Sequence, residues 1–166
     1  MGIAIALISI LTALHFAFGA PSFLIEQQGS FLAACAYSFF HANIWHLLVN
    51  CLAIWGLFAK SKQPRNHFAH LATALIIAIL VSPLSALPPI GFSNIIYALI
   101  GLRTPALSSP WWRRWPVIVF LLASVAMIPV PTVASVPHLA AFAIAVGCAY
   151  LVRFYYTLTA DARKYL

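Results

Sequence analysis

The stretch HANIWHLLVNCLAIWGLFA, residues 41 to 59, combines a long apolar run with two histidines and two asparagines. Apolar runs of roughly 17 to 25 residues recur along the chain and are typical of helices that cross a membrane. The composition agrees, because 64% of the 166 residues are hydrophobic, only 7% are charged and the mean hydropathy is +1.00. The sequence therefore predicts an all-α membrane protein, in which buried polar groups need partners or a cavity.

Proline and glycine clusters divide the chain into six apolar segments. We expect helices at about residues 3–19, 39–59, 67–85, 93–108, 114–131 and 135–156. The first segment follows no basic stretch and shows no small-residue cleavage pattern, so we interpret it as a retained helix and not as a signal peptide. No repeat or low-complexity linker interrupts the pattern, so residues 1–166 are expected to form a single six-helix transmembrane domain.

The basic residues share one side of this six-helix arrangement. They lie between helices two and three, between helices four and five, and at the end of helix six: Lys60, Lys62, Arg65, Arg103, Arg113, Arg114, Arg153, Arg163 and Lys164. The positive-inside rule then predicts that both termini are cytoplasmic and that helices two, four and six run inward from the outer surface. The net charge of +7 is thus explained by topology and lipid headgroups, and no nucleic acid partner is predicted.

Polar residues near the outer ends of these three helices share a predicted depth. On helix two, His46 and Asn50 share a face, and His41 is expected about one and a half turns above His46. Ser93 begins helix four, where free backbone N–H groups and the positive end of the helix dipole suit an oxyanion. We therefore expect these side chains to surround one site in the outer half of the membrane.

His138 begins helix six and can face Ser93 at that depth. A serine activated by a histidine base, with Asn50 and His46 as hydrogen-bond donors, forms a complete acyl-transfer constellation. Tyr97 lies one turn below Ser93 on the same face and can pack under the imidazole. Taken singly, each residue has an ordinary structural explanation, since a serine in a membrane helix usually bonds its own backbone and an asparagine can join neighbouring helices. The functional interpretation depends on the combination.

These motifs resemble those of the rhomboid intramembrane serine proteases. The second helix of that family carries H-x4-H-x3-N, the fourth opens with G-x-S followed by a tyrosine, and the sixth carries a histidine followed by small residues. The matching positions in this chain are His41, His46, Asn50, Gly91, Ser93, Tyr97, His138, Ala141 and Ala145. The likeness covers the whole six-helix core, and so compact a core is similar to the small bacterial forms, including the rhombosortase type.

The resemblance implies an intramembrane serine endopeptidase with Ser93 as nucleophile and His138 as general base. The Ser93 backbone N–H, His46 and Asn50 would form the oxyanion hole, and His41 would hold polar contacts and water near the site. The substrate would be a membrane-anchored protein, cut near the outer end of its transmembrane segment. The enzyme would be a multi-pass protein of the bacterial cytoplasmic membrane, and no metal or cofactor is implied.

The chain departs from the family pattern on both sides of the site, and in helix six Pro137 precedes the histidine where many members have alanine. Asn94 follows the nucleophile, where many rhomboids have glycine, and Ala141 stands three residues after the histidine, where many again have glycine. Small residues at these places let helices four and six approach closely. We therefore expect either a wider spacing of the two helices or an Asn94 side chain that turns away or bonds across the interface.

Two other classes of function are weighed against the protease. The first is a noncatalytic rhomboid-like protein that binds transmembrane segments in membrane quality control, although such proteins typically lose the serine or the histidine. The second is a transporter or metal carrier that uses His41, His46 and His138. Transport would need polar groups in the inner leaflet as well, and helices two, four and six are apolar there. The three cysteines show no paired spacing that indicates a zinc site or a disulfide.

Overall fold

The helices observed follow the predicted order closely. The computed structural model describes residues 2–18, 36, 38–59, 67–84, 91–104, 115–126 and 135–162. Its elements are α1 (Gly2–Phe18), α4 (Ile44–Ala59), α5 (His67–Val81), the short η2 (Ser82–Leu84), α6 (Ser93–Arg103), α7 (Trp115–Ala126) and α8 (Ser135–Ala162). These residues contain no strand, so the all-helical class is confirmed for the described part of the chain.

The start of the second long helix differs from the prediction. Helix α4 begins at Ile44 and not near residue 39, because Asn43 caps it. The Asn43 side-chain oxygen accepts a hydrogen bond from the His46 backbone N–H at 2.9 Å, and its carbonyl accepts one from Leu47 at 3.1 Å. An asparagine at the N-cap satisfies a backbone donor that would otherwise have no partner. His41 therefore precedes the helix, and its predicted place one and a half turns above His46 is wrong.

The later helix ends also shift. Helix α8 continues to Ala162, beyond the predicted end at 156, whereas α6 ends at Arg103. The last residues expected for the fourth and fifth helices, 105–108 and 127–131, lie outside the described residues. At 1.5 Å per residue, α8 alone is about 42 Å long, which exceeds the thickness of a hydrocarbon core.

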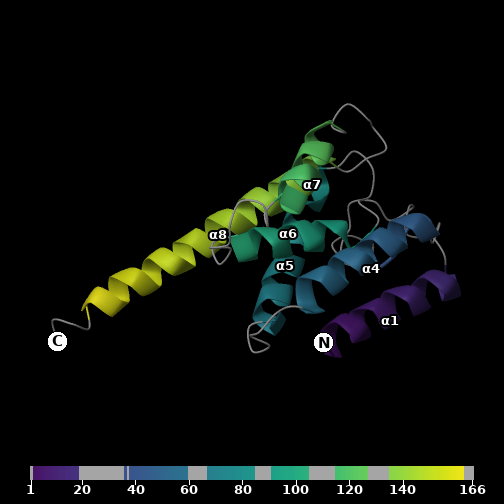
Figure 1. Ribbon diagram of the computed structural model, residues 1–166, viewed down its shortest axis with the longest axis horizontal. Coiled ribbons are helices and arrows are strands. Elements are labelled where there is room, and N and C mark those ends of the chain that lie inside the picture. Colours follow the sequence, from purple (N-terminus) through teal and green to yellow (C-terminus); the bar gives the residue numbers. More distant parts are fainter. Residues whose placement is uncertain are drawn as a thin grey trace.

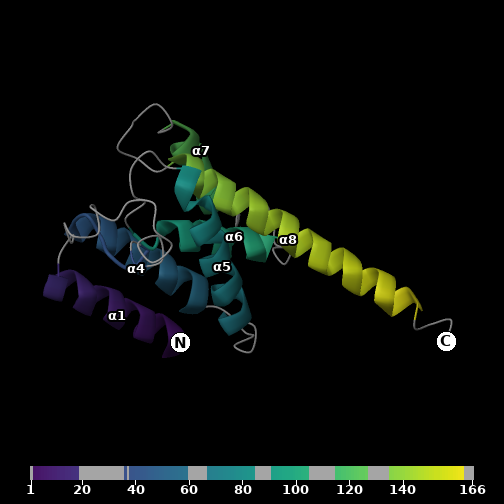
Figure 2. The ribbon, with the colours of Figure 1, turned by 180° about the vertical axis from the view of Figure 1, so that it is seen from behind.

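Helix α6 lies at the centre of the bundle (Figure 1). It packs against α4, α5 and α8, while α1 covers α4 and α7 lies beside α8. The opposite view shows the C-terminal half of α8 projecting beyond the other helices (Figure 2). Seven of the 11 residues of α6 are buried, and the other four are partly buried. A helix without a fully exposed residue is suited to this central position.

Helices α6 and α8 approach each other at Gly101. A methyl group placed on Gly101 would lie 2.5 Å from the Phe142 carbonyl oxygen and 2.8 Å from the Ala145 Cβ. Only a residue without a side chain allows the two backbones to come this close. The two backbones are therefore close near the C-terminal end of α6, whereas the prediction of a wider spacing concerns the region of Asn94 and Ala141.

The outer surface of the bundle is strongly apolar. Trp45 and Phe16 are each 73% exposed, and Phe68 is 71% exposed. Among the residues that the structure describes, two helical segments, His67–Leu84 and Ser135–Thr159, are long and apolar enough to cross a membrane. Large exposed apolar surface is rare in soluble monomers and suits contact with lipid. The fold and the surface together support a membrane protein.

Candidate active site

Ser93 is the first residue of α6, and it follows a turn at Gly91. Gly91 has a φ of +120°, a conformation that residues with side chains rarely adopt. Phe92 occupies the N-cap position without a side-chain cap, so the first backbone N–H groups of α6 receive no bond from that side chain. Ser93 is half-buried and begins the helix, where the first backbone N–H groups have no partner within the helix, as suits an oxyanion site.

His138 lies in the first turn of α8 and contacts Ser93 directly. Its Nε2 is 2.7 Å from the Ser93 Oγ, well within hydrogen-bonding distance. Pro137 is tolerated just before it, because the first turn of a helix has no internal acceptor for the missing N–H. In the tautomer with an unprotonated Nε2, the serine hydroxyl donates to the imidazole. This is the arrangement of a nucleophile and its general base.

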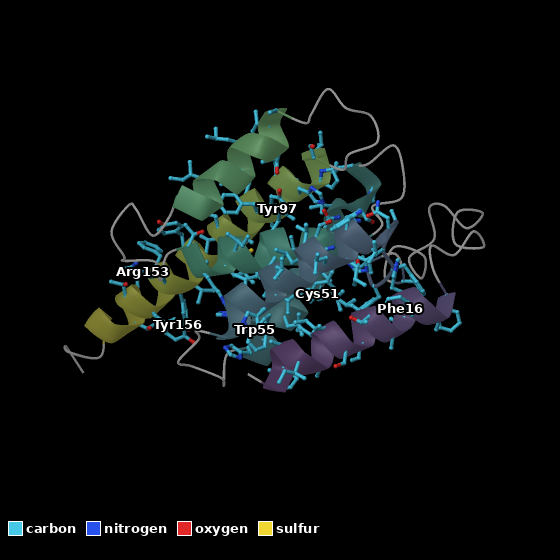
Figure 3. The ribbon with its side chains drawn as sticks, turned by 45° about the vertical axis from the view of Figure 1, so that its right-hand side comes forward. Phe16, Cys51, Trp55, Tyr97, Arg153 and Tyr156 are labelled. Atoms are coloured by element: carbon cyan, nitrogen blue, oxygen red, sulfur yellow. The ribbon has the colours of Figure 1, made fainter. Side chains whose placement is uncertain are left out.

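Tyr97 packs its ring against the His138 imidazole. Its ring is stacked on the His138 ring with centroids 4.6 Å apart and planes within 2° of parallel, as the sequence suggested. The Tyr97 hydroxyl is hydrogen-bonded to the Ser124 hydroxyl of α7. Figure 3 shows Tyr97 inside the bundle, in contrast to Arg153 and Tyr156 on the projecting part of α8. Sequence reasoning missed Ser124, although it is the single hydroxyl residue in the α7 sequence.

His46 and Asn50 meet the Gly91 turn from α4. A methyl group placed on Gly91 would lie 2.5 Å from the His46 Cε1, 2.8 Å from the His46 Nε2 and 3.4 Å from the Asn50 Nδ2. Both side chains therefore lie against the backbone two residues before Ser93. Asn50 is only 3% exposed, and its Nδ2 has no hydrogen-bond partner. A buried donor without an acceptor is costly, unless a ligand or a reaction intermediate supplies the acceptor.

His41 packs beside His46 and is not part of the contact between Ser93 and His138. Its side chain is fully buried, and its ring meets the His46 ring edge to face with centroids 5.3 Å apart. Neither nitrogen of the His41 ring has a hydrogen-bond partner. The structure therefore groups His41 with His46, at the end of α4 that faces the site.

Asn94, the residue after the nucleophile, is buried. It is 2% exposed, and its Oδ1 has no partner, so this oxygen does not accept a hydrogen bond across the α6–α8 interface. Ala141, which also departs from the family pattern, is fully buried as well. The two helices accommodate both residues and keep the 2.7 Å contact between Ser93 and His138.

Histidines are the main titratable groups around the site. No acidic side chain is among those the structure describes, so no carboxylate is seen to orient His138. Within the described ranges, no three His, Cys, Asp or Glu side chains gather as metal ligands would. Chemically, the cluster offers a hydroxyl, a base in contact with it and a nearby amide donor.

The comparisons with known proteins add no family to this geometry. The chain matches no protein-family model and no curated protein. Its function is therefore inferred from the site.

Proposed function

We propose that this chain is an intramembrane serine endopeptidase of the rhomboid type. The observation that carries the proposal is the 2.7 Å contact of the Ser93 Oγ with the His138 Nε2, beside the unpaired Asn50 amide. A solitary serine in a membrane helix would bond its own backbone, and a solitary asparagine would bond a neighbouring helix. The combination of a paired hydroxyl and an unpaired buried donor is what acyl transfer needs.

The reaction follows from these positions. The His138 Nε2 takes the proton of the Ser93 hydroxyl as the oxygen attacks the carbonyl carbon of the scissile peptide. The Ser93 backbone N–H, Asn50 and His46 donate to the oxygen on which negative charge develops. His138 then gives the proton to the leaving amine, and an acyl-enzyme remains on Ser93. Water activated by His138 releases the acyl group and restores the hydroxyl.

In this proposal the chain crosses the membrane six times. The apolar segments, the exposed apolar surface and the two helices long enough to span support it. The one-sided basic residues favour cytoplasmic termini, so the site would lie in the outer half of the bacterial cytoplasmic membrane. The substrate would be a membrane-anchored protein, cut near the outer end of its transmembrane segment.

The two alternative functions fit the geometry less well. A noncatalytic protein that only binds transmembrane segments has no need of a hydroxyl paired with an imidazole beside an unpaired amide donor. A metal carrier would need His138 as a ligand, whereas its Nε2 is in contact with Ser93. Both alternatives predict no reaction with a serine-directed probe.

A fluorophosphonate tests the proposed function without knowledge of the substrate. An activated serine displaces fluoride from the phosphorus atom and becomes covalently phosphonylated, while its proton passes to the base. We expect the protein in its native membranes to be labelled, and mass spectrometry of its peptides to place the label on Ser93. Absence of label, or a label on another residue, would overturn the proposal.

The Asn50→Ala variant tests the oxyanion hole. The rate of phosphonylation should fall by about 10²- to 10³-fold, the range for loss of one such donor. The probe concentration that gives half the maximal rate should change little, because the donor acts on charge that develops during the reaction. Labelling rates measured over a range of probe concentrations separate these two effects. If Asn50→Ala instead mainly lowers the thermal stability of the protein, Asn50 serves helix packing.

A further inference from the structure

Helix α7 turns one hydroxyl toward the interior. Ser124 is only 6% exposed, whereas Leu122 and Val125 on either side of it are 63% and 51% exposed. The rest of the α7 sequence offers no other hydroxyl. A helix in an apolar environment orients a polar side chain inward when a partner there satisfies it.

The partner of Ser124 is the Tyr97 hydroxyl. Tyr97 is 4% exposed, so its hydroxyl also needs a partner inside the protein. The face of the same tyrosine ring is stacked on His138, and His138 contacts Ser93. Three contacts thus connect α7 to the reactive hydroxyl: Ser124 with Tyr97, Tyr97 with His138, and His138 with Ser93.

We propose that Ser124 is a positioning residue, which anchors the Tyr97 ring and thereby holds the His138 imidazole in line with Ser93. This inference rests on the proposed function. In serine hydrolases with a carboxylate, the acid orients the imidazole through a hydrogen bond. No acidic side chain is among those described here, and the orienting surface is instead an aromatic face. A stacked ring fixes the plane of its neighbour only while it cannot itself rotate, and a hydrogen bond at its far end restrains that rotation.

The competing explanation is that the Ser124 hydroxyl only joins α7 to α6. Loss of the bond would then lower stability and leave the reaction rate of the folded protein unchanged. A positioning role predicts a lower maximal rate in protein that is still folded, since only the alignment of the base is affected.

The test is the rate of phosphonylation of purified Ser124 variants in detergent. For Ser124→Ala we expect the maximal rate to fall about fivefold, which corresponds to about 1 kcal/mol at 1.36 kcal/mol per tenfold. The probe concentration for half-maximal rate should not change. Ser124→Thr keeps a hydroxyl and should restore the wild-type rate to within about twofold. The matched control is Ser82→Ala, because the Ser82 hydroxyl bonds the Ile79 carbonyl of its own turn and takes no part in the contacts of Ser124 with Tyr97 and of Tyr97 with His138.

Tyr97→Phe removes the same hydrogen bond from its other end and keeps the stacked ring. It should reduce the maximal rate by a similar factor, and the double variant Tyr97→Phe/Ser124→Ala should be no slower than either single one. Wild-type rates in Ser124→Ala, strictly additive effects in the double variant, or failure of Ser124→Thr to restore the rate would overturn the inference. If Ser124→Ala does not fold, Tyr97→Phe and Ser124→Thr decide in its place. Absence of any labelling in the wild type would instead refute the proposed function, so the two failures are distinguishable.

Discussion

The Ser93→Ala variant is expected to lose all covalent labelling by a fluorophosphonate and all cleavage of a co-expressed membrane-anchored substrate. The variant has no oxygen at the position that the His138 Nε2 contacts, so no acyl-enzyme or phosphonyl-enzyme can form. Its fold should persist, because the hydroxyl is half-buried and its contact is to a side chain rather than to the core. Labelling of membranes and a thermal unfolding curve measure the two properties separately.

His138→Ala should have an effect almost as large. Without the base, the rate of phosphonylation is expected to fall by about 10⁴-fold or more, since members of a nucleophile–base pair act as a unit. The matched control is His70→Ala, which removes another partly buried histidine in the first turn of α5, outside the site. Labelling of His138→Ala at more than about 1% of the wild-type rate would contradict its role as the base.

Gly91→Ala should also slow the reaction, although less than loss of the nucleophile or the base. An alanine methyl group would lie 2.5 Å and 2.8 Å from two atoms of the His46 ring, so His46 must move. The φ of +120° adds strain of about 1–3 kcal/mol for a residue with a Cβ. Because this turn presents Ser93 and meets Asn50, we expect the rate of phosphonylation to fall by about 10²-fold or more, through misplaced donors and a shifted nucleophile.

A second glycine provides the control for that substitution. Gly56 lies within α4, and a methyl group placed there would meet nothing within 4 Å. Gly56→Ala should therefore leave the labelling rate unchanged and raise the stability of the helix by up to about 1 kcal/mol. If the phosphonylation rate of Gly91→Ala stays within about twofold of the wild-type rate, the reaction does not depend on the packing of His46 against this turn.

Much of the local structure could be predicted because local signals produce it. The prolines and glycines between apolar runs locate the helices, and α5, α6 and α8 begin at the predicted residues. The prediction of helix at residues 39–43 is wrong, because hydrophobicity alone does not separate a capped helix start from one more turn. The Asn43 side chain, which bonds the His46 backbone, was the signal that could have been used.

Only part of the site could be predicted by the same reasoning. Ser93 and Tyr97 could be placed on one face, since a spacing of four residues brings side chains together on any helix. The contact of Tyr97 with Ser124 joins residues 27 positions apart on different helices. It depends on how α6 and α7 are rotated about their axes, and a helix as uniformly apolar as α7 carries little information about that rotation.

The sequence by itself determined the helical segments, their apolar character and the set of polar side chains near the predicted outer ends. These follow from composition and from periodicity along the chain. Only the tertiary structure decided that α6 is central, that α6 and α8 cross closely at Gly101, and that His46 and Asn50 press on the turn at Gly91. The physical reason is that such contacts arise from close packing between helices, where the absence of a single methyl group sets the distance of approach.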